Sequence, residues 1–273
     1  MITIIPMSGS GSRFSNDGYL LPKPLIPVSG KTMIERVIES MPKTDKWMFV
    51  VRKEHVEDYN IDEHLKSIVP GAEIIIDTNP HGQASSCMLA VEKVDPEEDI
   101  FVAACDNSFM YSREKFEALK RDTDVDSIIW TFTQNALLKA KPEAWGWMKL
   151  QDDGLTIDDV SVKVPVSNDP YNDHAVVATF YFKKAGEFVQ AYNEMVEMDY
   201  KINNEWYIDA FPKFYTMLGK RSVIFDVDLY VGWGKPADLY EYQLKEYKYN
   251  ASLLDESDVQ DRLWKSFFTS LNE

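Results

Sequence analysis

The amino-acid sequence predicts an α/β protein with three layers, in which helices cover both faces of a central mixed sheet that is mostly parallel. Two observations indicate this class. Apolar strand-like runs alternate with amphipathic helical segments over residues 1–110, and strands dominate residues 111–240. Repeated strand–helix alternation is typical of parallel sheets, whereas clustered strands are typical of a mixed extension. We therefore expect a smaller β-rich lobe after the first half, followed by C-terminal helices.

The first half supplies the alternating elements. Short apolar runs bounded by turn residues predict strands at residues 2–7, 46–52, 72–78 and 99–106. Apolar residues spaced for one helical face predict helices at residues 30–41, 56–69 and 82–94. Because ligands collect at the carboxyl ends of parallel strands, we expect the loops after the first, third and fourth strands to carry the site.

The second half is richer in strands. We expect strands at residues 126–134, 145–151, 160–166, 174–182 and 221–234, with helices at 184–198 and 206–218. The predicted organisation is one domain at 1–240, divided near residue 110, with a helical extension at 241–273 packed on the same unit. Aromatic residues near the C-terminus are expected to dock on the core or on a neighbouring subunit, which allows a homo-oligomer: Trp264, Phe267 and Phe268.

Charge and composition exclude several classes of protein. The chain has 29 basic and 45 acidic residues, a net charge of −16 that disfavours nucleic acid and anionic membranes as partners. Its two cysteines, Cys87 and Cys105, form no CxxC pair, as expected in a reducing compartment. No apolar run approaches ~20 residues, and the N-terminus has no basic segment typical of a signal peptide. We expect a cytoplasmic protein.

A glycine-rich loop, "MSGSGSRF" at residues 7–14, follows the first predicted strand. It lacks the third glycine of a dinucleotide-binding loop and the Gly-Lys-Ser/Thr ending of a P-loop. Its glycines let backbone N–H groups approach phosphate oxygens closely, and its serines add hydroxyl donors. Arg13 adds a planar cation, and Lys23 follows between two prolines that hold its backbone extended. Two cations beside such donors predict a polyphosphate site.

These motifs, with "PKPLIPVSGKTMIERVI", resemble the signature of nucleotidyltransferases that make nucleoside-diphosphate-sugars and related activated metabolites. The family pattern is Gly-x-Gly-(Thr/Ser)-Arg, then Pro-Lys-Pro-(Leu/Met), then Gly-(Lys)-Pro-(Met/Leu)-(Ile). Thr32 stands where the last motif usually has proline. The resemblance implies a Rossmann-like fold of the GT-A type and catalytic roles for Arg13 and Lys23. It also implies nucleotide contacts from Ser8, Gly9, Ser10, Gly11, Ser12, Gly82 and Gln83.

Asp106 ends the fourth predicted strand, where a carboxylate is well placed for Mg²⁺, although aspartate also caps turns in such positions. It matches the metal-binding aspartate of the family. A second family aspartate, in Asp-(Ile/Thr)-Gly-Thr-Pro, falls on Gly232 here. Asp226 or Asp228 in the preceding strand could replace it, and we favour Asp228. We expect Asn107 to help position the acceptor.

Two further segments resemble acceptor-binding regions of the family. "VSVKVPVSND" is similar to its (Glu)-Lys-Pro region, so Lys163 is expected to bind the acceptor phosphate; the alternative is an outward-facing strand lysine. "NNEWYIDAF" resembles the acidic acceptor segment, with Glu205 as the contact and Asp209 behind it; the alternative is an exposed helix start.

The resemblance implies Mg²⁺-dependent transfer of a nucleoside monophosphate from an NTP to a phosphorylated small molecule, with release of pyrophosphate. The family default is a sugar-1-phosphate, giving a precursor for surface polysaccharides. A CTP-dependent enzyme acting on an alditol phosphate, phosphocholine or a phospho-amino acid is the alternative. A glycosyltransferase would instead need Asp-x-Asp after the fourth strand, where the sequence has Asp106-Asn107-Ser108.

Overall fold

The computed structural model describes residues 1–272, which divide into two compact units. Unit 1 comprises Met1–Ser10, Pro42–Ala104 and Arg113–Asp226. Unit 2 comprises Gly11–Met41, Cys105–Ser112 and the described residues from Val227 onward. This division differs from the predicted boundaries near residues 110 and 240, because the chain passes repeatedly from one unit to the other.

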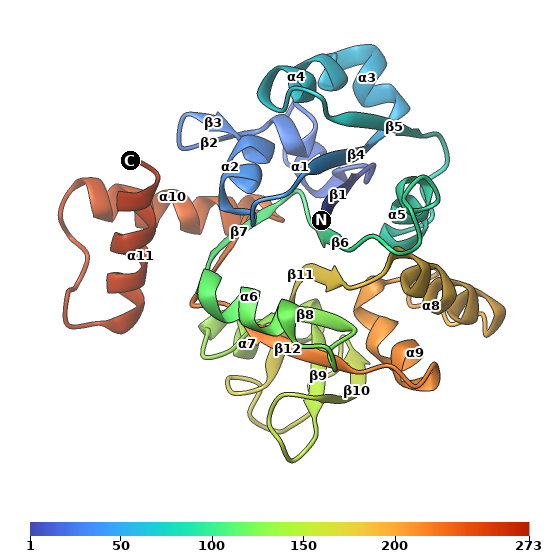
Figure 1. Ribbon diagram of the computed structural model, residues 1–273. Coiled ribbons are helices and arrows are strands. Elements are labelled where there is room, and N and C mark those ends of the chain that lie inside the picture. The colour runs from blue at the N-terminus through green and yellow to red at the C-terminus, as the bar shows by residue number, and fades with distance from the viewer. Residues whose placement is uncertain (273) are drawn as a thin grey trace. The chain divides into compact units, whose positions relative to one another are not determined.

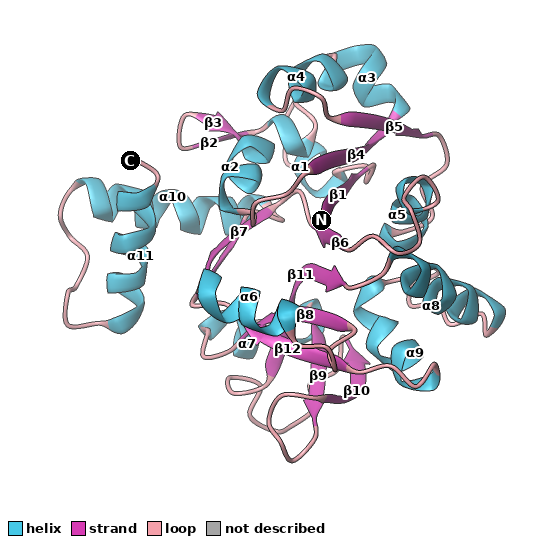
Figure 2. Ribbon diagram, viewed as in Figure 1, coloured by secondary structure: helices cyan, strands magenta, loops and turns pink. Residues whose placement is uncertain are grey.

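Unit 1 is built on a nine-stranded mixed sheet (Figures 1 and 2). Its strands are β1 (Ile2–Met7), β4 (Lys46–Arg52), β5 (Glu73–Asp77), β6 (Ile100–Ala103), β8 (Ser127–Phe132), β9 (Gly146–Leu150), β10 (Ile157–Val162), β11 (His174–Phe182) and β12 (Ser222–Asp226). The main order is β10-β9-β11-β6-β1-β4-β5, with β8 beside β11 and β12 beside β8. Strands β6, β1, β4 and β5 run parallel, so their carboxyl ends share one edge. The predicted α/β class is confirmed.

The helices of unit 1 are α3 (Lys53–Tyr59), α4 (Ile61–Ile68), α5 (Gln83–Val91), α6 (Arg113–Arg121), α7 (Ala136–Ala140), α8 (Ala185–Glu197) and α9 (Phe211–Met217), with 3-10 turns η2 (Pro142–Ala144) and η3 (Ile208–Ala210). Helix α5 packs on β1, β4 and β5. The single helix predicted at 56–69 is broken, because Asn60 has a φ of 51°. Asparagine tolerates this left-handed conformation better than most residues. Among residues 1–272, no helix combines the length and apolar character needed to cross a membrane.

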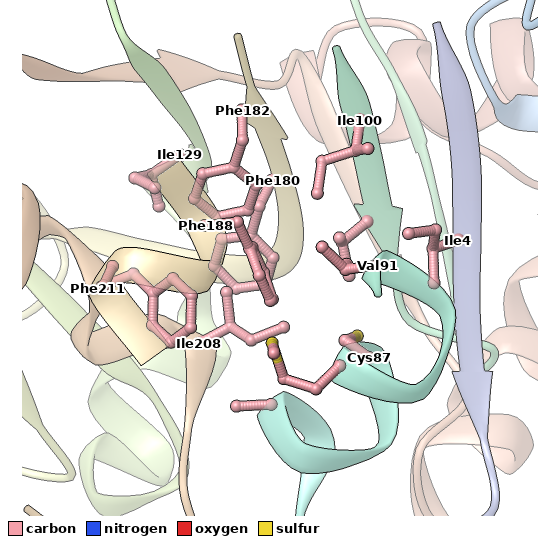
Figure 3. Close-up of a cluster of buried hydrophobic side chains, with 14 of the residues drawn as sticks. Ile4, Cys87, Val91, Ile100, Ile129, Phe180, Phe182, Phe188, Ile208 and Phe211 are labelled. Carbon is pink, nitrogen blue, oxygen red and sulfur yellow. The ribbon is translucent and has the colours of Figure 1, made fainter. Parts of the chain in front are cut away.

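The core of unit 1 joins α5, α8 and α9 to the sheet through fully buried side chains (Figure 3). Phe182 of β11 packs edge-on against Phe188 of α8, with ring centroids 5.1 Å apart. Phe188 in turn contacts Phe211 of α9 at 4.7 Å. Cys87 and Val91 of α5 fill the neighbouring part of the core. Burial of Cys87 raises the pKa of its thiol, so this cysteine acts as an apolar packing residue.

Unit 2 gathers residues from three separate parts of the chain. It contains α1 (Ser12–Ser15), η1 (Lys23–Leu25), β2 (Pro27–Val28), β3 (Lys31–Thr32), α2 (Met33–Ser40), β7 (Asn107–Met110), β13 (Leu229–Gly232), α10 (Pro236–Asn250) and α11 (Val259–Ser270). Strands β2 and β3 form a small hairpin, and β7 pairs antiparallel with β13. The strand predicted at 221–234 is therefore two strands, β12 and β13, which belong to different units.

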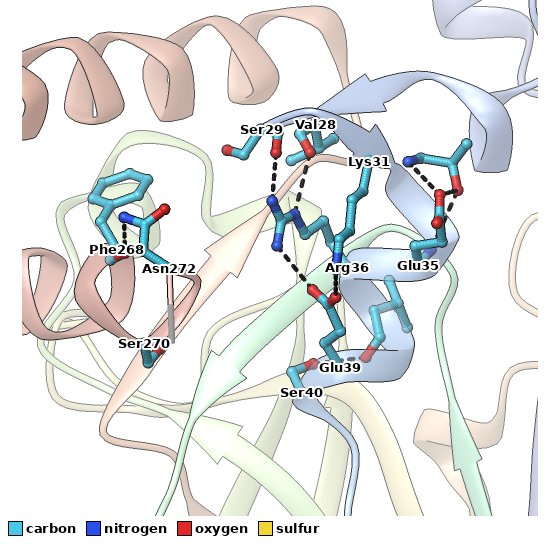
Figure 4. Close-up of polar contacts among 12 residues, drawn as sticks. Val28, Ser29, Lys31, Glu35, Arg36, Glu39, Ser40, Phe268, Ser270 and Asn272 are labelled. Atoms are coloured by element: carbon cyan, nitrogen blue, oxygen red, sulfur yellow. Dashed lines mark hydrogen bonds and ion pairs between the residues drawn. The ribbon is translucent and has the colours of Figure 1, made fainter. Parts of the chain in front are cut away.

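The β2–β3 hairpin is held by side chains of α2 (Figure 4). Arg36 is 6% exposed and donates to the carbonyl oxygens of Val28 and Ser29, while its guanidinium lies 2.9 Å from the Glu39 carboxylate. Thr32 caps α2: its hydroxyl accepts from the Glu35 N–H, and the Glu35 carboxylate accepts from the Thr32 N–H at 2.7 Å. This capping box explains why threonine serves at the position where the family has proline.

The C-terminal helices α10 and α11 pack within unit 2. Tyr242 of α10 contacts the rings of Trp233, Trp264 and Phe268. Its hydroxyl also lies 2.5 Å from the Ser29 hydroxyl in the hairpin turn. The aromatic cluster expected to dock on the core or on another subunit is thus used, within this chain, to attach α11 to α10.

Replacing Phe182 with alanine tests the core of unit 1. We expect Phe182→Ala to lower the free energy of unfolding by about 3–5 kcal/mol, because it leaves a cavity among four aromatic rings. Urea unfolding followed by tryptophan fluorescence measures the change. Met198→Ala, at a side chain that is 52% exposed, is the control and should stay within about 0.5 kcal/mol of the parent. Equal effects from the two variants would contradict this account of the core.

Candidate active site

The glycine loop leaves the carboxyl end of β1 and passes from unit 1 to unit 2 between Ser10 and Gly11. The Ser8 hydroxyl donates to Asp77 at 3.0 Å and lies 2.9 Å from the Ser86 hydroxyl. Ser86 donates to the same Asp77 oxygen at 2.6 Å, and all three residues are buried. The Ser8 side chain is therefore bound inside the protein, whereas Gly9 and Ser10 are exposed.

Asp77 and Ser86 were not among the predicted site residues. Asp77 ends β5 as Met7 ends β1, so the parallel register brings their loops to the same sheet edge. An aspartate at the end of an apolar strand was the available signal, the same one that drew attention to Asp106. Together with Ser8 they fix the start of the glycine loop against β5 and α5.

Gly82 lies at the start of α5 with a φ of 112°. A Cβ at Gly82 would stand 3.0 Å from Glu205 Cβ and 3.1 Å from the Trp206 backbone. The Ala84 N–H also donates to the Trp206 carbonyl at 3.1 Å. The structure thus brings Gly82 and Gln83, predicted to contact the nucleotide, beside Glu205, predicted to contact the acceptor. Gly82 is needed there for close backbone packing.

Lys163 follows β10, which ends at Val162 rather than continuing to residue 166. Its φ is 69°, and its N–H donates to the Trp145 carbonyl at 2.8 Å. The half-buried ammonium lies 5.9 Å from the centre of the Tyr207 ring. Lys163 is therefore held at the end of the strand and does not occupy the outward-facing strand position that was the alternative.

Asp209, in η3, lies next to Lys163 and Gly146. Its Oδ2 is 2.5 Å from the position that a Cβ on Gly146 would take. Burial of the carboxyl group raises the pKa of Asp209 to about 6, although a backbone hydrogen bond and the charge of Lys163 oppose that rise. Gly146 leaves the space in which this carboxyl group sits, so unit 1 holds a lysine and an acid that titrates near neutral pH side by side.

In unit 2, the Lys23 ammonium lies 2.7 Å from Asp106 Oδ2, and both side chains are 23% exposed. Burial lowers the pKa of Lys23, but the charge and hydrogen bond of Asp106 outweigh it, so the pKa is raised overall. The positive charge of Arg13 works against this rise. A Cβ on Gly11 would lie 3.5 Å from Lys23 Cβ. Unit 2 thus brings together Gly11, Arg13, Lys23 and Asp106.

The β7–β13 ribbon places Asp106 at one end and Asp228 at the other. Trp233 donates its N–H to the Asp106 carbonyl at 2.8 Å, and buried Asn107 pairs with Gly232. The Asp228 N–H instead donates to Met110 at 2.8 Å. Asp228 and Gly232 are four positions apart, which is about 13 Å along a strand. The strand register therefore places Asp228 too far from Asp106 for the two to share a metal ion, and that expectation is wrong.

The alternative ligand, Asp226, lies in unit 1 and is already engaged. Its carboxylate accepts from the Thr131 hydroxyl at 2.7 Å and lies 3.0 Å from His174 Nδ1. The choice between Asp226 and Asp228 assumed that both lie in one unbroken strand. The chain instead leaves β12 at Asp226 and enters β13 at Leu229.

The donors around Asp106 suit one divalent cation of the Mg²⁺ type. Within residues 1–272, no three His, Cys, Asp or Glu side chains form a metal-binding group. Two carboxylates lie beside Gly234: a Cβ on that residue would stand 3.1 Å from Asp106 Oδ2 and 4.0 Å from Asp238 Oδ2. Mg²⁺ is commonly held by one or two carboxylates and completed by water and substrate phosphates. The residues present fit that pattern.

Comparison with known proteins agrees with this geometry. Residues 3–134 match the family model of the MobA-like NTP transferase domain. The fold is similar to a nucleoside-diphosphate-sugar pyrophosphorylase from Vibrio cholerae (TM-score 0.71, 21% identity, covering 89% of this chain and 99% of that one). It is also similar to a putative glucose-1-phosphate thymidylyltransferase from Bacillus anthracis, with a TM-score of 0.69 and 18% identity. A third similar structure is the inositol-1-phosphate CTP transferase from T. maritima, with a TM-score of 0.66 and 17% identity. Each of these two matches covers 89% of this chain and 94% of the other.

No curated protein sequence matches the chain closely enough to count as a relative. The family match covers the glycine loop, Lys23 and Asp106, the residues on which the predicted resemblance depended. This match confirms the resemblance to nucleotidyltransferases that was predicted from the glycine loop.

Proposed function

We propose that the chain transfers a nucleoside monophosphate from an NTP to a phosphorylated small molecule, with Mg²⁺ as cofactor and pyrophosphate as the second product. The observation that carries this proposal is the 2.7 Å pair of Lys23 and Asp106. It sets a cation suited to phosphate beside a carboxylate suited to a metal ion, in the unit that also contains Gly11 and Arg13.

The chemistry requires alignment rather than a strong base. A phosphate oxygen of the acceptor attacks the α-phosphorus, and the bond from that phosphorus to the oxygen bridging to the β-phosphorus breaks. The nucleophile is already an anion and needs no proton removed. The protein must hold two anions in line and offset their repulsion. A bound divalent cation would supply Lewis-acid neutralisation of the phosphate charge.

Arg13 and Lys23 are assigned to the NTP. We assign Lys23 to the α-phosphate and Arg13 to the leaving pyrophosphate, because a guanidinium binds two phosphate oxygens at once. The raised pKa of Lys23 keeps its ammonium charged throughout the neutral range. Gly9, Ser10 and Ser12, all exposed, are assigned to phosphate contacts from the loop.

Unit 1 supplies the groups assigned to the acceptor and the base. Lys163 would bind the phosphate group of the acceptor. Glu205 and Asp209 would accept hydrogen bonds from the hydroxyl groups of the same acceptor molecule. Gln83, at the start of α5, can both donate to and accept from a base edge. A sugar-1-phosphate is our first choice for the acceptor, as in sugar-nucleotide synthesis for surface polysaccharides. The similarity to an inositol-1-phosphate CTP transferase supports testing CTP with alditol phosphates as well.

A pyrophosphate-release screen tests the proposal. Each NTP would be incubated with Mg²⁺ and a panel of sugar-1-phosphates, inositol-1-phosphate, alditol phosphates, phosphocholine and phospho-amino acids. We expect pyrophosphate release from one NTP and one acceptor class, because both anions must be bound together. No pyrophosphate release in any mixture, together with hydrolysis of a nucleotide-sugar in a parallel incubation, would instead favour a glycosyltransferase.

Lys23→Ala tests the residue at the centre of the proposed mechanism. We expect turnover to fall by at least about a hundredfold, since the variant loses charge stabilisation at the reacting phosphate. The melting temperature should stay close to that of the parent, because one partly exposed ion pair contributes little to stability. Lys265→Ala, at an exposed lysine of α11, is the matched control and should keep parental turnover. Near-parental turnover of Lys23→Ala would remove Lys23 from the mechanism.

Asp209→Asn tests the buried acid near Lys163. Its folded-state pKa of about 6 exceeds the ordinary value of 3.8. Between these values the folded protein binds a proton that the unfolded chain has released, so this group's contribution to stability falls as pH rises. The stability of Asp209→Asn relative to the parent should therefore increase from pH 4 to pH 6 and then level off. Urea unfolding at several pH values, with exposed Asp152→Asn as control, measures it; a flat difference would contradict the raised pKa.

A further inference from the structure

The carboxylate of Asp238 lies close to Asp106 although the two residues are far apart in the sequence. Asp238 is in the first turn of α10, and Gly234 in the preceding loop follows Trp233, which is bonded to Asp106 through its backbone. One point beside Gly234 lies within 3.1 Å of Asp106 Oδ2 and within 4.0 Å of Asp238 Oδ2. Because Gly234 has no side chain, nothing from that residue separates the two carboxylates.

Tyr230 occupies the space beside Gly232, the position on which the second aspartate of the resembled family pattern falls. A Cβ on Gly232 would stand 2.7 Å from the Tyr230 hydroxyl oxygen and 2.9 Å from its ring. A carboxylate side chain at position 232 is therefore incompatible with Tyr230 as it lies. Burial is the main cause that raises the pKa of Tyr230, and the charges of Asp106 and Asp238 add to it, so the hydroxyl stays neutral.

We propose that Asp238 supplies the second carboxylate for the divalent cation at Asp106. It would take the role of the aspartate that the family pattern has at position 232, where this chain has glycine. The inference rests on the proposed metal-dependent function. Two anionic groups this close repel each other unless a cation lies nearby, and in the structure the Lys23 ammonium is bonded to Asp106. The start of α10 also favours a negative side chain at position 238. Tyr230 acts as a positioning residue that fills the space over Gly232.

The test measures binding of Mn²⁺ alone, followed by the electron paramagnetic resonance signal of the free ion. The full-length chain is used both with its native lysine and with Lys23→Met, which removes the competing ammonium. We expect Asp106→Asn and Asp238→Asn each to weaken Mn²⁺ binding about tenfold or more in both backgrounds. Glu241→Gln, an exposed acid one turn further along α10, is the matched control and should bind like its parent.

Three outcomes would overturn the proposal: parental Mn²⁺ affinity in Asp238→Asn, loss of affinity in Asp228→Asn instead, or no Mn²⁺ binding by the parent in either background. None of these measurements uses an NTP or an acceptor. Failure to find a substrate pair would therefore count against the proposed function without changing the Mn²⁺ result, and the two failures can be told apart. Circular dichroism confirms that each variant is folded.

Discussion

The ion pair between Lys23 and Asp106 is the interaction on which the rest of the candidate site depends. It joins the turn after the glycine loop to the segment that enters β7, two parts of the chain separated by 83 residues. A partly exposed pair of this kind contributes only about 1 kcal/mol to stability. Its importance lies in placement, because it fixes one cation and one carboxylate at hydrogen-bonding distance in a chain whose net charge is −16.

Rigid neighbours hold both members of this pair in place. Lys23 is enclosed by Pro22 and Pro24, and the following hairpin is clamped to α2 by Arg36. Asp106 is fixed through its backbone by Trp233, whose ring packs against Tyr242. Unit 1 provides a comparable arrangement for its own groups, because two glycines have no side chains: Gly146 leaves room for Asp209, and Gly82 leaves room for Glu205 and the Trp206 backbone. In each unit, small or rigid residues position the charged ones.

Much of the fold was predictable because its signals are local. The apolar runs at residues 2–7, 46–52 and 174–182 became strands with those bounds. The predictions that were wrong about where an element ends have a common cause. In each, the hydrophobic pattern of the element continues in the sequence past the residue at which the backbone changes conformation. The helical spacing runs on through Asn60, which is left-handed, and the alternating pattern runs on through Lys163, where β10 has already ended.

The site was predictable to the extent that it depends on motifs. The motifs identified Arg13, Lys23 and Asp106, and the structure brings these three together in one unit. The choice of Asp228 relied on an unbroken strand at 221–234, and nothing in that alternation marks the break after Asp226. The proximity of Asp238 to Asp106 arises from the turn between β13 and α10, whereas Tyr230 and Gly232 both lie within β13. No local pattern in the sequence encodes that turn.

The make-up of unit 2 has a consequence for how the protein is synthesised. The glycine loop and Lys23 are translated early, yet the hydroxyl that meets Ser29 belongs to Tyr242, and the rings that pack on Tyr242 include Phe268 near the end of the chain. Such distant contacts form slowly, and they cannot form on a ribosome that still holds the last helix. Unit 1 can begin to assemble its sheet during translation. Unit 2 is completed only once α11 has left the ribosome, so a chain that stopped before α10 would keep the strands of the sheet but lack the Tyr242 contacts with Ser29 and Phe268.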